Sequence, residues 1–178
     1  MKIHIFGASG SGVTTLGKTL SEKLNIEYFD SDDFFWLRTK VPFTKRQAPE
    51  IRNTTLSQKL TTTNSWILGG SVIHWGENIF PEFDLVIFLY LPQDIRLERL
   101  KKREIERYGD EITLNPERQE MFEKFIKWAR DYDEDTGIAN RTLNAHRDWL
   151  SKISCPVIEI NGDYEIDKKI KIILDKIQ

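Results

Sequence analysis

Hydrophobic residues along the chain fall into short continuous runs that alternate with segments of helical spacing. The short runs predict strands at residues 2–6, 26–29, 66–68, 84–91 and 156–160. The segments of helical spacing predict helices at residues 15–24, 50–62, 93–107, 117–132, 141–153 and 166–177. Because strands separated by helices pair in parallel, the pattern predicts a three-layer, doubly wound α/β fold with helices on both faces of a parallel sheet.

Composition narrows the class of protein. The 178 residues contain no internal repeat and no low-complexity linker, so we expect one domain over residues 1–178. A net charge of −2 with 30% charged residues disfavours a nucleic-acid partner. The single Cys155 excludes an internal disulfide and a metal site made of cysteines alone. Because no apolar run is long enough to span a membrane and no signal-peptide layout is visible, we expect a cytoplasmic protein without a membrane partner.

A glycine-rich segment, residues 7–15, connects the first predicted strand to the first predicted helix. Gly7, Gly12 and Thr14 fit the phosphate-binding pattern G-x-x-x-x-G-K-[ST], in which backbone N–H groups surround phosphates and the hydroxyl contacts Mg²⁺. The lysine position of this pattern is Val13, so the charge that neutralises a transferred phosphoryl group must come from elsewhere or be absent. The predicted nucleotide-binding residues are Gly7, Ser9, Gly10, Ser11, Gly12, Val13, Thr14 and Thr15.

Two other interpretations of this segment remain open. It could be an ordinary Gly/Ser connection between a strand and a helix. It could also be a dinucleotide-binding fingerprint, because three glycines crowd the turn and Asp30 or Asp32 lies about 20 residues further on, where a ribose-binding carboxylate is expected. The glycine offsets differ from G-x-G-x-x-G, which disfavours the dinucleotide interpretation.

Five segments, taken in this order, resemble the P-loop small-molecule kinases related to adenylate, other nucleoside monophosphate and shikimate kinases. The segments are residues 7–15, Asp30-Ser31-Asp32, Leu68-Gly69-Gly70, the strand at 84–89 with Arg99-Leu100-Lys101-Lys102-Arg103 after it, and Ile158-Glu159-Ile160-Asn161-Gly162. The resemblance covers essentially the whole chain. It implies the nucleoside-monophosphate-kinase type of P-loop fold, ATP or another nucleoside triphosphate with Mg²⁺, and a small-molecule phosphoryl acceptor.

The resemblance also implies roles for two aspartates after the second strand. Asp32 would help to hold the metal with Thr14, and Asp30 would contact the acceptor, although either could take either role. If the strand pleat continues, the two carboxylates point the same way. No aspartate follows the third strand or Leu89 directly, so no ordinary Walker-B carboxylate is visible and the metal depends on this pair. The alternative is a solvated, Asp-rich turn.

Arginines could replace the charge that Val13 does not provide. By resemblance, Arg99 would stack on the adenine and Arg103 would reach phosphate. Arg130 and Arg141 would close over the nucleotide from beyond a LID-like segment at about 104–130, and Asn161 and Gly162 would line the nucleotide site. The alternative is a set of surface arginines paired with neighbouring glutamates.

The segment at about 32–64 corresponds to the part that grips the acceptor in these kinases. It contains three consecutive aromatic residues, Phe34 to Trp36, and several basic residues that include Arg46 and Arg52. Aromatic rings beside basic groups could bind a flat or phosphorylated acceptor, or they could form a satellite core. Among the acceptor contacts we predict Arg52, Gly69 and Gly70.

The favoured function is ATP-dependent phosphoryl transfer to a small acceptor, by a kinase similar to adenylate kinase. A nucleoside monophosphate, a sugar acid and a shikimate-like acid all remain open as acceptors. The first alternative is a nucleotide-binding or sensing module with lost or weak kinase activity, which Val13 would permit. The second is an NAD(P)-binding oxidoreductase.

Overall fold

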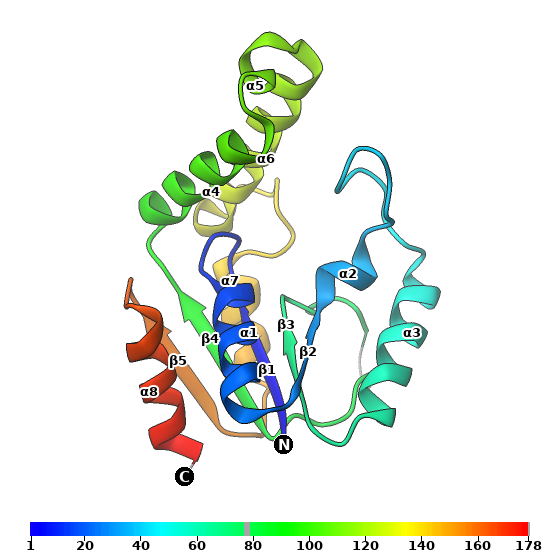
Figure 1. Cartoon of the computed structure of the whole chain (residues 1–178), viewed down its shortest axis with the longest axis vertical. Coiled ribbons are helices and arrows are strands. Elements are labelled where there is room, and N and C mark those ends of the chain that lie inside the picture. Colours follow the sequence, from blue (N-terminus) through cyan, green and yellow to red (C-terminus); the bar gives the residue numbers. More distant parts are fainter. Residues whose placement is uncertain (77–78, 178) are drawn as a thin grey trace.

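A five-stranded sheet forms the centre of the protein in a computed structural model that describes residues 1–76 and 79–177. The strands are β1 (Lys2–Gly7), β2 (Glu27–Asp30), β3 (Trp66–Gly69), β4 (Leu85–Tyr90) and β5 (Val157–Asn161). They pair in parallel in the order β2-β3-β1-β4-β5. The carboxyl ends of all five strands therefore meet at one edge of the sheet (Figure 1).

Helices cover both faces of the sheet and extend beyond its carboxyl edge. They are α1 (Val13–Leu24), α2 (Ser31–Phe35), α3 (Pro49–Thr62), α4 (Gln93–Tyr108), α5 (Glu111–Leu114), α6 (Pro116–Glu134), α7 (Leu143–Leu150) and α8 (Ile166–Ile177). Helices α1 and α8 pack on one face, α3 and α7 pack on the other, and α4, α5 and α6 form an arm above the carboxyl edge (Figure 1). The predicted three-layer parallel α/β fold is confirmed. None of the helices described here has both the length and the apolar composition needed to cross a membrane.

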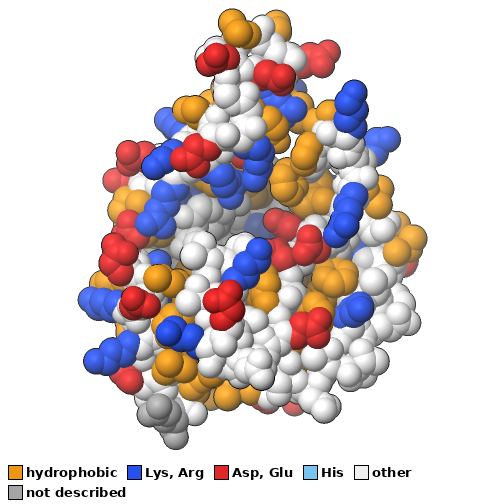
Figure 2. Space-filling view, viewed as in Figure 1, with side chains coloured by type: hydrophobic (Ala, Val, Ile, Leu, Met, Phe, Trp, Pro, Cys, Tyr) orange, Lys and Arg blue, Asp and Glu red, His pale blue; other side chains and the backbone are white. Residues whose placement is uncertain are grey.

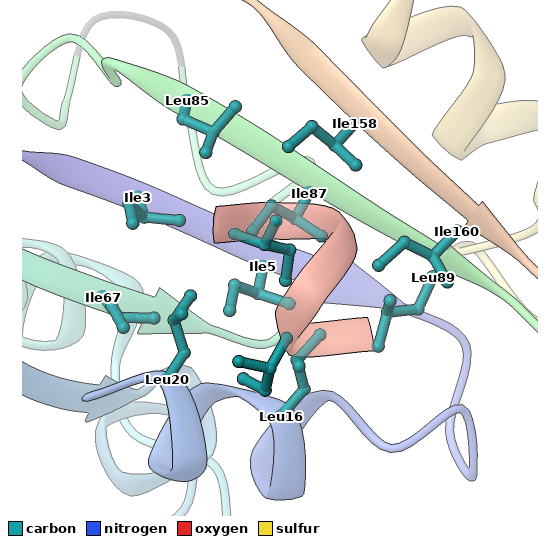
Figure 3. Close-up of a cluster of buried hydrophobic side chains, with 12 residues drawn as sticks. Ile3, Ile5, Leu16, Leu20, Ile67, Leu85, Ile87, Leu89, Ile158 and Ile160 are labelled. Carbon is teal, nitrogen blue, oxygen red and sulfur yellow. The ribbon is translucent and has the colours of Figure 1, made fainter. Parts of the chain in front are cut away.

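The alternation of side chains along the strands explains why both faces need cover. In β1, Ile3 and Ile5 join the cluster under α1 and α8, whereas Phe6 joins the cluster under α7. Successive side chains of a strand point to opposite faces, so a strand that is apolar at every position has to be buried on both sides. Figure 3 shows the first cluster, in which Leu16 and Leu20 of α1 meet the strand residues.

Two short helices were not predicted from the sequence, and one predicted helix is shorter than expected. Helix α2 has five residues and α5 has four, so neither is long enough to show helical spacing of apolar residues. Helix α7 begins at Leu143 rather than at residue 141, because Thr142 is its N-cap and accepts a hydrogen bond from the N–H of Ala145 at 3.2 Å. The expected continuation of the β2 pleat is wrong, because α2 starts directly after Asp30.

Tyr28 fills the space between α1 and β3 below the glycine-rich loop. A Cβ atom added at Gly17 of α1 would overlap the Tyr28 ring, and one added at Gly69 of β3 would overlap its hydroxyl. The two glycines therefore let an aromatic ring pass between a helix and the sheet. The ring ends at Asp30, to which the Tyr28 hydroxyl donates a hydrogen bond at 3.0 Å.

This packing predicts that a glycine-to-alanine substitution in α1 lowers the free energy of unfolding, whereas such a substitution in a helix normally raises it. In an ordinary helix interior, Gly→Ala stabilises by about 1 kcal/mol, whereas overpacking a core costs about 1–3 kcal/mol. We expect Gly17→Ala to lower the free energy of unfolding in urea. Lys18→Ala, at the exposed next position, serves as the control and should change it little. A stabilising Gly17→Ala would contradict the position of the Tyr28 ring.

Candidate functional site

The loop between β1 and α1, residues 7–15, has the backbone conformation of a phosphate-binding loop, and we call it the P-loop. Gly10 and Gly12 have φ angles of 85° and 92°, which favour glycine. A Cβ atom at Gly7 would overlap the carbonyl oxygen of Leu89, so β4 passes too close for any side chain there. At Gly12 no heavy atom lies within 4 Å of an added Cβ, so this side of the loop is open.

The P-loop leaves its backbone donors available. Helix α1 makes its first hydrogen bond from the N–H of Leu16 to the carbonyl of Gly12, at 3.0 Å, and Gly12 provides no side-chain cap. The N–H groups of Val13, Thr14 and Thr15 have no acceptor among the described residues. The hydroxyl of Ser11 is buried and also lacks a partner within residues 1–76 and 79–177. Free N–H groups at the positive end of a helix dipole suit a phosphate.

Val13 places an apolar, packed side chain at the position where the P-loop pattern has a lysine. Its side chain is half-buried and lies against the core cluster under α1 and α8. An apolar side chain at this position stabilises the start of α1, but it leaves the loop without a cation of its own. The positive charge near the site comes from other elements.

Asp30 lies against Thr14, which differs from the predicted pairing of Thr14 with Asp32. The Thr14 hydroxyl donates to Asp30 Oδ2 at 3.1 Å, and the Tyr28 hydroxyl donates to the same oxygen. The other oxygen of Asp30 caps α2 by accepting the N–H of Asp32 at 3.1 Å. Because the chain turns into α2 after Asp30, it is Asp30 that lies beside the predicted metal-binding hydroxyl.

Asp32 faces basic residues across the cleft. Its side chain remains partly exposed to solvent, but the protein around it removes enough water to raise the pKa of its carboxyl. The charge of the neighbouring Asp30 raises this pKa further, and the charge of Arg141 opposes the shift. Burial lowers the pKa of both Arg103 and Arg141, and the charge of Asp32 opposes that shift in each. The predicted catalytic residues are Asp32, Arg103, Arg130 and Arg141. The structure brings together three of these four, namely Asp32, Arg103 and Arg141.

Three guanidinium groups surround the ring of Phe35, and we call them the arginine cluster. Their central carbons lie 5.6 Å (Arg46), 5.6 Å (Arg52) and 5.1 Å (Arg141) from the ring centroid. Arg52 is 7% exposed and also lies 3.9 Å from the ring centroid of Trp75. Arg52 and Arg141 were predicted from the sequence, whereas Arg46 was noted only as one basic residue among several.

Arg141 is held in place by the residues on either side of it. The carboxylate of Asp131, at the end of α6, accepts hydrogen bonds from the N–H groups of Thr136, Ile138 and Ala139 at 2.7–2.8 Å. These bonds and one from the Thr136 hydroxyl lower the pKa of Asp131 to about 2. The loop before Arg141 is thus fixed to α6, and the Thr142 cap fixes the residue after it to α7.

A buried histidine joins three elements behind the arginine cluster. His146 of α7 makes hydrogen bonds to the Tyr132 hydroxyl at 2.9 Å and to the Ser71 hydroxyl at 3.0 Å. Burial lowers the pKa of His146 to about 3, so the ring is neutral at physiological pH. The neutral ring therefore connects α6, α7 and the segment after β3.

Arg96 is a fully buried arginine that the sequence analysis missed. Its guanidinium donates to the carbonyl oxygens of Leu91 at 3.1 Å and Ser9 at 3.2 Å, and it forms an ion pair with Asp133. Burial raises the pKa of Asp133 although Arg96 opposes the shift. Arg96 therefore connects the P-loop, through Ser9, to α6. The available sequence signal was its position in the same helical stripe as Leu97 and Leu100.

The remaining predicted nucleotide contacts form a second group. Arg99 of α4 forms an ion pair with Asp163 at 2.5 Å, directly after Asn161 and Gly162. The N–H of Gly162 donates to the carbonyl of Tyr90 at 2.9 Å, so the segment after β5 stays against β4. Arg99 therefore lies beside Asn161 and Gly162, the other predicted nucleotide-binding residues outside the P-loop.

Three predicted contact residues have a different setting from the one expected. The guanidinium of Arg130 is exposed on α6 and makes no ion pair or ring contact within the described residues. At Gly69 and Gly70, an added Cβ would overlap Tyr28 and Ser31 respectively, so these glycines make room for protein side chains. Binding roles for these three residues stay predictions.

Figure 2 shows the surface hollowed between the arm and the body of the molecule, with acidic side chains on one wall and basic side chains above them. No group of three or more His, Cys, Asp or Glu side chains suited to a metal occurs in residues 1–76 and 79–177. A hydroxyl and one carboxylate, Thr14 and Asp30, fit a Mg²⁺ ion whose other ligands are phosphate oxygens and water.

Comparison with known proteins agrees with this geometry. A family model described as AAA domain matches residues 3–126. The chain is similar to the uncharacterized protein YqaC of Bacillus subtilis (strain 168), with 42% identity over 97% of this chain and 95% of that protein. It is also similar to the shikimate kinase of Acinetobacter baumannii (strain AYE), with 30% identity over 54% of this chain and 59% of the kinase.

Among solved structures, the fold is similar to that of a deoxyadenosine kinase from M. mycoides with bound dATP. The TM-score is 0.59 at 16% sequence identity, and the match covers 99% of both chains. At this identity the likeness concerns the fold. The resemblance to P-loop small-molecule kinases that the sequence motifs indicated is confirmed, and the matches favour the P-loop interpretation over a dinucleotide fingerprint.

The contacts of Arg96 predict that replacing this residue strongly lowers the free energy of unfolding. Removing one partner of a buried ion pair costs about 3–5 kcal/mol, because the other partner and the carbonyl groups stay buried without a donor. We expect Arg96→Met to lower the free energy of unfolding by about this amount in urea denaturation. Arg99→Met is the control, since it removes an exposed ion pair of the same helix and should cost under about 1 kcal/mol. Equal effects of the two variants would contradict the assigned role of Arg96.

Proposed function

This chain belongs to the family described as AAA domain and to the P-loop small-molecule kinases, and we propose that it transfers the γ-phosphoryl group of ATP, or of another nucleoside triphosphate, to a hydroxyl group of a small acceptor. The observation that carries the proposal is the setting of Asp32 near the P-loop. Asp30, two residues before it, accepts a hydrogen bond from Thr14 of the P-loop, the N–H groups at the start of α1 are free, and the charge of Arg141 acts on the Asp32 carboxylate.

The P-loop and the residues beside it would hold the nucleotide. The N–H groups of Val13, Thr14 and Thr15 bind phosphate oxygens, and Arg99, paired with Asp163, contacts the base beside Asn161 and Gly162. Mg²⁺ supplies positive charge that neutralises the phosphates during phosphoryl transfer. Thr14 and Asp30 orient this ion, and Tyr28 holds Asp30 in position through its hydrogen bond.

Asp32 would accept the proton of the acceptor hydroxyl. The new bond forms between the acceptor oxygen and the γ-phosphorus, the bond from this phosphorus to the bridging oxygen breaks, and the proton passes to Asp32. Its raised pKa favours proton acceptance, because a more basic carboxylate is a better general base. Arg103 and Arg141 then stabilise the charge that develops on the phosphoryl oxygens, which Val13 leaves without a lysine.

The acceptor of this proposal is a small molecule with a hydroxyl and an anionic group. A shikimate kinase and a deoxyadenosine kinase are among the relatives and structural neighbours, and their acceptors differ. A nucleoside monophosphate, a sugar acid and a shikimate-like acid each carry an anion that Arg52 and Arg141 could bind. The proposal is tested by following ADP formation with each of these compounds in the presence of ATP and Mg²⁺; no turnover with any of them would count against a kinase.

A nucleotide-binding or sensing module is the second candidate, and Val13 is the observation that favours it. Without the P-loop lysine, the loop could still bind phosphates through its N–H groups while phosphoryl transfer is slow. Nucleotide binding with no phosphorylation of any acceptor would support this candidate.

If the P-loop binds the nucleotide, ATP with Mg²⁺ should raise the melting temperature of the protein, and this thermal shift should depend on Gly12. Ligand at 100 times its Kd stabilises a protein by about 2.7 kcal/mol, which corresponds to a shift on the order of 5 °C for a domain of this size. We expect this shift with ATP and Mg²⁺ and none with NAD⁺. Gly12→Leu should abolish it, because the side chain occupies the open side of the P-loop.

Gly137→Leu is the matched control for this experiment. Gly137 has a φ of 91°, against 92° for Gly12, and an added Cβ there also meets no atom within 4 Å. The two variants therefore carry similar backbone strain, but only one changes the P-loop. An ATP shift that survives Gly12→Leu, or a larger shift with NAD⁺, would place the nucleotide elsewhere.

The proposed role of Asp32 predicts that its substitution lowers turnover. It also predicts that turnover of the unchanged protein depends on pH. With any acceptor that is phosphorylated, Asp32→Asn should lower kcat by about a hundredfold, the scale for losing one general base. In the unchanged protein, kcat should fall as the pH decreases through the pKa of Asp32, which lies above its usual range. Asp33→Asn is the control, because the neighbouring Asp33 is exposed and has no assigned role. If Asp32→Asn retains full turnover, the carboxylate only shapes the turn.

A further inference from the structure

Two segments project beyond the carboxyl edge of the sheet. The first is a hairpin between α2 and α3, residues 36–47, in which Trp36 and Arg46 are an antiparallel pair. The second is the tip of the arm, residues 110–123, which contains α5 and the start of α6. Figure 1 shows both segments on the same side of the molecule, with α5 at the far end of the arm. One partner can therefore contact both segments at the same time.

The hairpin is basic and the tip of the arm is acidic. The basic residues of the hairpin are Arg38, Lys40, Lys45 and Arg46, and its sequence contains no acidic residue. The acidic residues of the tip are Asp110, Glu111, Glu117, Glu120 and Glu123, and its one basic residue is Arg118. In Figure 2 the two charge types gather at these two places. Surfaces of opposite charge attract each other and fix the register in which they meet.

Most of these charges are not compensated by the chain that carries them. Arg46 faces the ring of Phe35, Glu120 pairs with Lys124, and Arg118 lies 4.0 Å from the ring centroid of Tyr108. The other charged residues of the two segments form no ion pair among residues 1–76 and 79–177; they are Arg38, Lys40, Lys45, Asp110, Glu111, Glu117 and Glu123. These side chains are exposed and can pair with a second molecule.

Exposed apolar side chains accompany the charges on both segments. Leu114 at the tip of the arm is 79% exposed, and Phe43 at the tip of the hairpin is 46% exposed. Val41 and Met121 are also exposed, one on each segment. Apolar residues surrounded by charged ones are typical of a surface that binds another protein. The charges would select the partner, and the apolar side chains would supply buried area.

The tip of the hairpin has a fixed conformation before any partner binds. The carbonyl of Val41 accepts hydrogen bonds from the hydroxyls of Thr39 and Thr44 at 2.6 Å and 2.7 Å. Phe43 has a φ of 60°, a left-handed conformation that is unfavourable for a residue with a side chain. A segment that is already ordered loses little conformational entropy on binding, which favours association.

We propose that two copies of this chain form a dimer with two-fold symmetry, in which the basic hairpin of each copy binds the acidic tip of the other copy's arm. Two-fold symmetry makes the two contacts identical, so one complementary pair of segments is used twice. A second copy is the partner that the charges specify, because both members of the pair lie on the same chain and project to the same side. The inference concerns assembly and does not depend on the proposed function.

Reversal of charge in either segment tests the dimer by analytical ultracentrifugation. At 0.15 M salt, charges more than about 8 Å apart are largely screened, so close pairs dominate the result. We expect the unchanged protein to dimerise with a Kd on the order of 10 µM, in the range of small, transient interfaces. Lys40→Glu/Lys45→Glu and Glu117→Lys/Glu123→Lys should each raise this Kd by at least about tenfold, because like charges then face each other.

An equal mixture of the two variants distinguishes contact between chains from contact within one chain. In a mixed pair, the reversed hairpin meets the reversed tip, and the unchanged hairpin meets the unchanged tip. Both contacts regain opposite charges, so we expect the Kd of the mixed pair to return to within about threefold of that of the unchanged protein. If each hairpin binds the arm of its own chain instead, mixing the variants changes nothing.

Lys18→Glu/Lys171→Glu is the matched control. It changes the net charge by the same amount at exposed residues of α1 and α8, and it should leave the Kd of the dimer unchanged. If a double variant does not fold, the single reversal Lys45→Glu or Glu123→Lys takes its place, with a smaller expected increase in Kd.

Three results would overturn the proposal. One is an unchanged protein that stays monomeric at about 200 µM, far above the expected Kd. Another is a hairpin or tip variant that dimerises like the unchanged protein. The third is a mixture that associates no more strongly than the separate variants.

Discussion

The guanidinium of Arg96 has no exposed surface, and the position of the P-loop relative to the arm depends on it. A buried cation is costly unless every donor finds an acceptor. Here the acceptors come from separate parts of the chain: Leu91 at the end of β4, Ser9 in the P-loop, and Asp133 with the carbonyl of Ala129 in α6. A shift of any one of these parts would leave donors of Arg96 unpaired. The interaction therefore fixes the distance between the free N–H groups of the P-loop and the helix that leads to Arg141.

The distribution of charge follows from what the P-loop lacks. With Val13 packed on the core, the positive charge lies on α4, on the hairpin formed by residues 36–47, on α3 and in the loop before α7. These elements come from distant parts of the sequence, and most of them lie outside the sheet. A lysine in the P-loop would be present in every arrangement of the cleft, whereas a cation on the hairpin, such as Arg46, reaches a bound ligand only when the hairpin is near. Charge stabilisation is thereby linked to the conformation of the cleft.

The sequence was sufficient for those features that arise from local pattern. Apolar strands, helical spacing and the glycines of the P-loop are set by near neighbours, and their predicted positions agree with the structure within a few residues. The hydrogen-bond partner of Thr14 could not be predicted from the sequence, because it depends on where β2 ends. The helix that ends β2, α2, has five residues and is too short to show a helical period. Arg96 was missed for another reason: it occurs in a helix with many charged residues, where an arginine is normally exposed. Its burial is decided by α6 and the P-loop, neither of which is near it in sequence.

Contact between the arm and the hairpin defines how the cleft is bounded. The Arg107 guanidinium of α4 lies 5.4 Å from the ring centroid of Phe43 at the hairpin tip, where both side chains meet solvent. A cation–π contact at an exposed site contributes only about 0.5–1 kcal/mol. Breaking it costs much less than separating the arm from the P-loop, which would leave Arg96 unpaired. The side of the cleft that moves most easily is therefore the hairpin, the segment that carries Arg46, while the side that carries the P-loop stays fixed.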